Sequence, residues 1–358
     1  MEFLHTADWQ IGMKAATAGG AAAAVRQARL ESAARVTAMQ ADFLLVAGDT
    51  FEDNAVDRAL VQQTGEILSR FAGPVYLLPG NHDPLQPGSV WEHAVWRQYP
   101  NLHVVREAAA IPIPGGTLLA TPLRETHSRN DPTTALAALP RPDGTTIAMS
   151  HGTVEGVDPD TEHHPIARQA AERARVAYLA LGHWHSTSLY ADAGGAVRMA
   201  YCGTHETTKF GERDSGNVLR VRLPGGEAPP MVEAVRTGVL VWPLLEEEVR
   251  ISGDMERVRD RVAALPERAL LRLELRGLLH PADTEFLRQI EEMRGRFLHM
   301  TLDSSALRPA AGEGWEELLP AGAVRMAARQ LRERAAQGDA VAVDALLELQ
   351  VLARQVGA

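Results

Sequence analysis

Residues 42–49 have the sequence DFLLVAGD, an apolar run that ends directly on a glycine and a carboxylate. A short, continuous apolar run bounded by glycine is typical of a strand covered on both faces of its sheet. Four other apolar runs are each followed closely by a polar residue: residues 2–6 before Asp8, 75–78 before Asn81, 146–149 before His151 and 176–181 before His183. Because ligand sites lie outside the carboxyl ends of such strands, we expect these polar side chains to gather at one rim.

Helical segments separate the apolar runs. Residues 21–40 and 57–71 have the composition and length of helices. Strands buried on both faces that alternate with helices predict a layered α/β fold.

The pattern changes near residue 240. Residues 270–276 alternate leucine with charged residues, which is the period of a strand with one face in solvent. Strands expected near residues 245–251 and 297–302, and helices over 254–265 and 282–294, complete a β-α-β-α-β module. We therefore expect three parts: residues 1–240, residues 241–307, and a helical tail of residues 308–358. The tail starts with a linker that contains Pro309 and Gly312, and its helices are expected over 320–337 and 339–356.

The composition excludes several classes of protein. A net charge of −10 over 358 residues argues against a protein that coats nucleic acid through a global basic field. Lys14 and Lys209 are the only lysines, so nearly all positive charge is arginine. The sequence has no P-loop motif and no apolar run near the roughly 20 residues that span a bilayer. Residues 1–5 lack the basic and apolar regions of a signal peptide, so we expect none. A single cysteine, Cys202, excludes an intrachain disulfide, and we expect a cytoplasmic protein without a membrane partner.

The polar residues after the expected strands form one set of candidate metal ligands. They offer carboxylate, amide and imidazole donors without a thiolate: Asp8, Gln10, Asp49, Asn81, His151, His183 and His185. Such donors suit borderline divalent ions such as Mn²⁺, Fe²⁺ or Zn²⁺ better than Ca²⁺. Paired ions of this kind lie roughly 3.5–4 Å apart and hold a phosphoryl group between them. The set therefore predicts a two-metal phosphoesterase site.

In this order, the motifs resemble those of the calcineurin-like metallophosphoesterases: D-x-[H] at residues 8–10, GD at 48–49, GNHD at 80–83, HG at 151–152 and GHxH at 182–185. Within that superfamily, FLHTAD (residues 3–8), GDTF (48–51) and SHG (150–152) are similar to the SbcD exonucleases. The nearest subgroup is the YhaO-type DNA repair exonucleases. A later stretch, with Glu206 and FGE at residues 210–212, extends the similarity to about residue 220.

The resemblance implies a fold, an activity and partners. The fold would be a four-layer αββα metallophosphoesterase sandwich with a small capping domain and a C-terminal helical tail. The activity would be metal-dependent hydrolysis of DNA in repair or recombination, by exonuclease or endonuclease cleavage of single strands or duplex ends. The tail would bind an SMC-like, SbcC-type ATPase, and the family also allows a homodimer.

The resemblance further implies a role for each motif residue. The first ion would be held by Asp8, Gln10, Asp49 and His185. The second would share Asp49 as a bridge and would also be held by Asn81, His151 and His183. His82 would protonate the leaving oxygen or stabilise the transition-state charge, and Asp83 would orient it. Mn²⁺ is the expected ion, with Mg²⁺, Fe²⁺ or Zn²⁺ as alternatives.

Two positions depart from the family pattern. Gln10 stands where the family usually has histidine, which should weaken the first site or favour Mn²⁺ or Mg²⁺. Glu52 follows GDTF where the SbcD-type nucleases often have histidine, which leaves cleavage polarity open.

Other residues have both a functional and an ordinary interpretation. Arg124, His127 and Arg129 lie in a polar loop that either contacts a phosphate backbone or is simply solvated. Trp184 either stacks on a base or packs against a neighbouring loop.

Histidines outside the motif set are expected to have no role in metal binding. His5 ends an apolar run and should be a buried, hydrogen-bonded core residue. His163 and His164 should lie in a solvated acidic loop.

Two alternatives to a DNA nuclease remain. One is a phosphodiesterase or phosphatase acting on small molecules. The other is a DNA-binding scaffold with a weakened metal site, motivated by Gln10 and Glu52. The length of chain beyond the motifs favours a macromolecular substrate.

Overall fold

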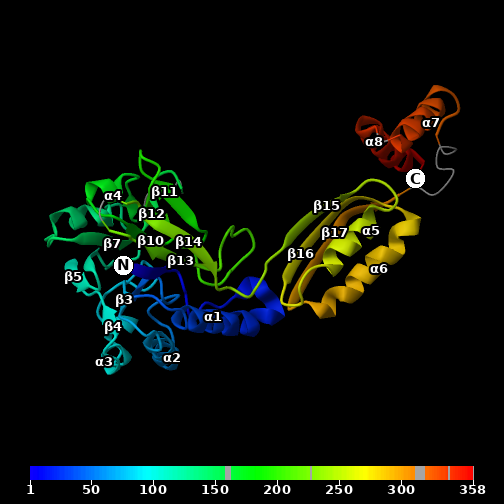
Figure 1. The fold of residues 1–358 in the computed structure, drawn as a ribbon. Coiled ribbons are helices and arrows are strands. Elements are labelled where there is room, and N and C mark those ends of the chain that lie inside the picture. Colours follow the sequence, from blue (N-terminus) through cyan, green and yellow to red (C-terminus); the bar gives the residue numbers. More distant parts are fainter. Residues whose placement is uncertain (158–162, 226–227, 311–318, 338, 358) are drawn as a thin grey trace. The chain divides into compact units, whose positions relative to one another are not determined.

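The computed structural model describes residues 1–157, 163–225, 228–310, 319–337 and 339–357. The chain divides into two compact units, residues 1–240 and 241–358 (Figure 1). All the motif residues lie in the first unit.

The first sheet of the larger unit has six strands in the order β14-β13-β1-β2-β3-β4. Its parallel part consists of β1 (Glu2–Thr6), β2 (Phe43–Val46), β3 (Val75–Leu77) and β4 (Leu102–Val104). Each crossover in this part carries one helix: α1 (Ala22–Thr37), α2 (Arg58–Ser69) and α3 (Val95–Gln98). On the other side of β1 lie the antiparallel strands β13 (Asn217–Arg222) and β14 (Met231–Arg236).

The second sheet also has six strands, in the order β11-β12-β10-β7-β6-β5. Its parallel part consists of β6 (Gly116–Ala120), β7 (Thr145–His151), β10 (Leu179–Gly182) and β12 (Val197–Tyr201). The edge strands β5 (Ala109–Ile113) and β11 (Ser188–Ala191) are antiparallel to their neighbours. Nearby are a two-stranded pair, β8 (Thr153–Val154) and β9 (Pro165–Ile166), and the short helix α4 (Ala170–Arg173).

The core explains why the strands appear as continuous apolar runs. One cluster joins the two sheets, with Phe3, Phe43 and Tyr76 from the first sheet and Leu118, Ile147 and Met149 from the second. Leu4, Leu44 and Leu77 alternate with these residues, so they lie on the opposite face, where they pack with residues of α1, α2 and α3. Both faces of the first sheet are therefore covered, and the prediction of an α/β fold is confirmed.

The second unit contains a parallel three-stranded sheet in the order β15-β16-β17. Its elements are β15 (Leu244–Val249), α5 (Asp254–Ala263), β16 (Leu270–Leu279), α6 (Thr284–Glu292) and β17 (His299–Pro309). Two further helices follow, α7 (Ala323–Ala336) and α8 (Ala340–Gly357), which contact each other. Gly312 and most of the expected linker lie outside the described residues.

Short 3₁₀ helices complete the structure: η1 (Ala16–Ala21), η2 (Val90–Glu92), η3 (Pro132–Ala138), η4 (Pro281–Asp283) and η5 (Met293–Arg296). No helix in the described part of the chain has the length and apolar character needed to cross a membrane.

Candidate metal centre

The carboxyl ends of β1, β2 and β10 carry strained backbone. Asp8, Gln10 and Asp49 have positive φ angles of 54°, 39° and 51°, and His183 has a φ of 111°. Residues other than glycine adopt this region at a cost, and such strain tends to occur at functional sites. Hydrogen bonds hold the first two turns together, because the backbone N–H of Gln10 donates to the carbonyl of Asp49 at 2.9 Å.

Glycines allow these turns to approach one another. A Cβ on Gly48 would collide with the ring of His151, and a Cβ on Gly80 would collide with the carboxylate of Asp49. Only glycine leaves room at these two positions. The two sheets can therefore bring their polar residues into direct contact.

Three predicted ligands form a compact cluster. Ligand atoms of Asp49, His151 and His183 all lie within 4.8 Å of one another. The amide Oδ1 of Asn81 lies 2.9 Å from both His151 Nε2 and His183 Nδ1. Asp49 Oδ2 lies 3.3 Å from His151 Nε2. This is the group that the resemblance assigns to the second ion, with Asp49 as the bridge.

Asp8 and Gln10 lie beside this cluster. The carboxylate of Asp8 is fully buried and accepts the backbone N–H of His183 at 2.9 and 3.1 Å. Burial raises the pKa of Asp8 to about 6, against the lowering effect of His151 and His185. The side chain of Gln10 is also buried, at 6% exposure.

His185 has a partner that orients its ring. His185 Nδ1 lies 2.7 Å from Glu212 Oε1, and the Glu212 side chain is only 3% exposed. Glu212 also accepts the backbone N–H of Thr208 at 2.7 Å. A carboxylate that accepts one ring N–H leaves the other ring nitrogen, Nε2, for a metal.

His82 is also held in one orientation. Its Nδ1 lies 2.9 Å from the carbonyl oxygen of Glu52, which can only accept, so Nδ1 carries the proton and Nε2 is left for another partner. The carboxylate of Asp83, expected to orient His82, instead accepts the backbone N–H groups of Gly80 and Phe51 at 2.7 and 3.0 Å. Asp83 therefore positions the loop, and the backbone of Glu52 positions the ring.

Burial and charge act against each other within the cluster. Burial would raise the pKa of Asp49, but His151 outweighs it and holds that pKa below its usual value. Burial favours the neutral form of His151, but the Asp49 carboxylate raises its pKa to about 9. Burial, followed by the charge of His151, lowers the pKa of His183 to about 3. The neutral ring of His183 and the carboxylate of Asp49 are in the forms that bind a metal, whereas His151 would release a proton on binding.

The donor set fits divalent metal ions. Carboxylate, amide and imidazole donors converge, and His185 and His151 both have the hydrogen-bonded second nitrogen that is usual for metal-site histidines. The ligand types favour Mn²⁺, Fe²⁺ or Zn²⁺ over Ca²⁺.

A cavity of about 400 Å³ opens beside the cluster. His183, Trp184 and His185 form one part of its lining, and Lys209, Phe210 and Glu212 form another. Trp184 is only partly buried, and it also packs against the apolar cluster of the second sheet. The two interpretations of Trp184 therefore do not exclude each other.

His163 also lines this cavity, contrary to the expectation of a solvated loop. Its ring centroid lies 5.5 Å from that of His183 and 5.6 Å from that of His127. The neighbouring His164 is buried, at 3% exposure. Long-range hydrogen bonds fix this segment, and periodicity within the segment gives no sign of them.

The predicted substrate loop has a mixed outcome. His127 lies near the site, because its ring stacks on the ring of His163, which lines the cavity. The guanidinium of Arg124 donates to the carbonyl of Arg106 at 2.7 Å, and Arg129 is exposed. Neither arginine lines a described cavity.

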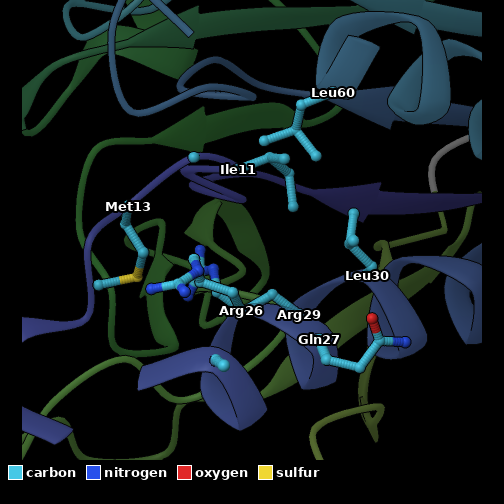
Figure 2. A pocket seen from close by; sticks show the side chains of 9 residues that line it. Ile11, Met13, Arg26, Gln27, Arg29, Leu30 and Leu60 are labelled. Carbon is cyan, nitrogen blue, oxygen red and sulfur yellow. The ribbon is translucent and has the colours of Figure 1, made fainter. Parts of the chain in front are cut away.

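A second cavity, of about 330 Å³, lies between α1 and the loop after β1 (Figure 2). Arg29 lines it and is buried, and its guanidinium donates to the carbonyls of Trp9 and Asp8. Burial lowers the pKa of Arg29 to about 10, which leaves it charged at neutral pH. Arg29 therefore holds the backbone of Asp8 in its strained conformation.

His5 is a core residue, as expected. It is fully buried, with Nδ1 2.9 Å from the hydroxyl of Tyr178 and Nε2 3.0 Å from the carbonyl of Leu181.

Comparisons with known proteins bear on the larger unit. The family model described as calcineurin-like phosphoesterase matches residues 1–187 of the 358. The match to the solved structure of TT1561 from Thermus thermophilus covers 66% of this chain and 98% of the TT1561 chain, with 13% identity and a TM-score of 0.40. A 5'-nucleotidase precursor from the same organism matches 66% of this chain and 54% of its own, with 14% identity and a TM-score of 0.38. No curated protein matches the chain.

Proposed function

The chain belongs to the calcineurin-like phosphoesterase family, and on that premise we propose that it is a metal-dependent DNA nuclease acting in repair or recombination. In this proposal the larger unit is the four-layer αββα sandwich of an SbcD/YhaO-type nuclease, and residues 241–307 are its capping domain. The site holds two divalent ions, with Mn²⁺ preferred. The protein works in the cytoplasm.

One observation carries the proposal. Asp49, His151 and His183 offer ligand atoms within 4.8 Å of one another, and they come from two different sheets. Asp8 lies next to this group because its carboxylate accepts the backbone N–H of His183, and His185 follows His183 by two residues. A set of this kind suits phosphoester hydrolysis, because charge on a phosphoryl group is stabilised between paired ions.

The residues of the chain supply positioning and proton transfer. When bound, divalent ions at this site supply Lewis-acid stabilisation of the phosphoryl charge. His82 Nε2 is the atom that would meet the leaving oxygen, since Nδ1 donates to Glu52. Burial lowers the pKa of His82, but the charge of Asp49, the hydrogen bond to the Glu52 carbonyl and the charge of Glu52 together outweigh it and raise that pKa above its usual value. A raised pKa favours the protonated ring, which is the form that a general acid requires.

The second unit supports a macromolecular substrate and a partner. More than 170 residues follow the part of the chain that matches the family model. Within the described residues, α7 and α8 carry half of the exposed large apolar side chains, among them Met326 at 64% and Val341 at 74% exposure. Exposed apolar surface fits a protein partner, and we propose an SMC-like, SbcC-type ATPase.

A scaffold role is the second candidate, because Gln10 replaces the usual histidine and Glu52 replaces another. In that role the protein would bind DNA without cleaving it. A small-molecule phosphoesterase would instead cleave simple phosphate esters and leave DNA intact.

Cleavage of labelled single-stranded DNA in Mn²⁺ separates these functions. We expect cleavage by the wild-type protein and its loss in Asp49→Asn, which removes the bridging charge. Asp143→Asn, on an exposed aspartate, is the matched control and should cleave normally. An Asp49→Asn protein that cleaves at the wild-type rate would contradict the proposal. DNA binding without cleavage would support the scaffold, and cleavage of p-nitrophenyl phosphate alone would support the small-molecule enzyme.

A further inference from the structure

The cavity of about 400 Å³ begins at the metal centre and extends away from it. His183 and His185, which the family pattern assigns to the second and first ions, both line it. A phosphoryl group bound by those ions would therefore lie at one end of the cavity. The remaining space is of the size that takes one small organic ligand.

His163 is fixed on one side of this cavity. Its carbonyl accepts the backbone N–H of Thr153 at 3.1 Å, and it forms a parallel bridge with Ser128. These contacts tie His163 to the segment that directly follows His151. These contacts fix the backbone of His163, and in either tautomer a neutral imidazole carries one N–H group of the kind that donates to phosphate oxygens.

Lys209 lies in another part of the lining, in the turn between Thr208 and Glu212. Glu212 holds this turn, because it accepts the backbone N–H of Thr208 at 2.7 Å and that of Lys209 at 3.4 Å. The same carboxylate accepts from His185. The backbone of Lys209 is therefore positioned by the group that orients a metal ligand, and the residue is exposed.

The lining also contains two aromatic side chains, Trp184 and Phe210. Aromatic faces bind unstacked bases with little dependence on sequence, and cationic side chains bind backbone phosphates. The cavity thus combines both parts of a nucleotide-binding surface. This local arrangement contrasts with the net charge of −10 over the whole chain.

We infer that this cavity is a subsite for the nucleotide that adjoins the scissile phosphate, with His163 and Lys209 as its phosphate-binding residues. The inference rests on the proposed function and names a substrate class within it. The substrate is a strand with at least one phosphate beside the one that is cleaved. The adjoining base must be unpaired to stack in the cavity.

A comparison of substrate and protein truncations tests the inference. Thymidylyl-thymidine contains one phosphate, and the corresponding trinucleotide contains one more, whichever bond is cut. In Mn²⁺, the wild-type protein should gain about tenfold in kcat/KM from the added phosphate, since a charge-assisted hydrogen bond is worth at least that factor. In Lys209→Ala and His163→Ala, this gain should fall to about twofold or less, whereas Lys209→Arg should keep most of it.

Two controls remove similar groups elsewhere. Arg70→Ala removes an exposed cation at the end of α2, and His103→Ala removes an exposed imidazole on the edge strand β4. Both should keep the full gain. In addition, the slope of log KM against log salt for a longer single strand should fall by about 0.7 in Lys209→Ala, the value for one lost phosphate contact.

The outcomes are distinguishable. If Lys209→Ala and His163→Ala both keep the wild-type gain, the subsite is overturned while the nuclease proposal stands. If the wild-type protein cleaves both substrates but gains nothing from the added phosphate, the subsite is also overturned. If it cleaves neither substrate, the proposed function falls and the subsite falls with it.

Discussion

Glutamine in place of Glu212 tests how the chain orients a metal ligand. Glu212 Oε1 lies 2.7 Å from His185 Nδ1, and at 3% exposure water cannot readily replace it. Burial would raise the pKa of Glu212, but the hydrogen bond and charge of His185 and the hydrogen bonds from Thr208 together outweigh burial and lower that pKa. The carboxylate is therefore ionised at neutral pH, and the substitution removes a charge while keeping the shape of the side chain.

Loss of such a partner typically lowers metal affinity about 10–100-fold, or about 1.4–2.7 kcal/mol. We expect this loss at the first ion only, because the groups around the second ion, Asn81, His151 and His183, do not contact Glu212 among the hydrogen bonds described above. The assay is a Mn²⁺ titration that resolves two sites, by calorimetry and by metal content after equilibrium dialysis. Glu172→Gln, on an exposed glutamate of α4, is the control. Equal affinity at both sites in Glu212→Gln, with unchanged thermal unfolding, would refute the orienting role.

Three further predictions follow from other residues. His82→Ala should lower turnover of single-stranded DNA by about 10²–10⁴ and keep the Mn²⁺ content, because His82 acts on the substrate; loss of metal in this variant would contradict that role. Gln10→His should raise first-site Mn²⁺ affinity by supplying an imidazole nitrogen, and a wild-type protein that already binds two ions with equal, tight affinity would contradict the weak-site hypothesis. Burial lowers the pKa of His5 to about 3, below the unfolded value near 6.5, so the unfolded chain takes up a proton that the folded chain does not as pH falls below 6.5. The free energy of unfolding should therefore fall by about 2 kcal/mol more between pH 6.5 and 5 in the wild type than in His5→Gln. Urea unfolding at several pH values measures this, and an equal fall in the two proteins would contradict the prediction.

The strands that carry the motifs could be predicted from the sequence because both of their faces are buried. Residues 42–47 were expected as a strand, and β2 occupies Phe43–Val46. Periodicity could not show that these strands belong to two sheets, since an apolar run has the same pattern in either. The edge strand β11 was not predicted, because its burial alternates and its pairing with β12 is a long-range feature.

At the candidate site, too, local sequence patterns identified residues that follow strands but not contacts between distant segments. Local motifs indicated Asp49, His151 and His183, because each directly follows a strand. Glu212 belongs to a stretch that contributed to the family resemblance, but its contact with His185 depends on a turn that is 27 residues away in sequence. No signal within residues 163–164 indicated that His163 would lie against His183. Pairings of this kind depend on tertiary contacts that a local pattern does not encode.

The central claim is that two metal ions bind between the two sheets of the larger unit. Diffraction from crystals soaked in Mn²⁺, recorded at the manganese absorption edge, tests it most directly. We predict two anomalous peaks roughly 3.5–4 Å apart, with Asp49 between them. No peak near Asp49, His151 and His183, even at saturating Mn²⁺, would contradict the claim.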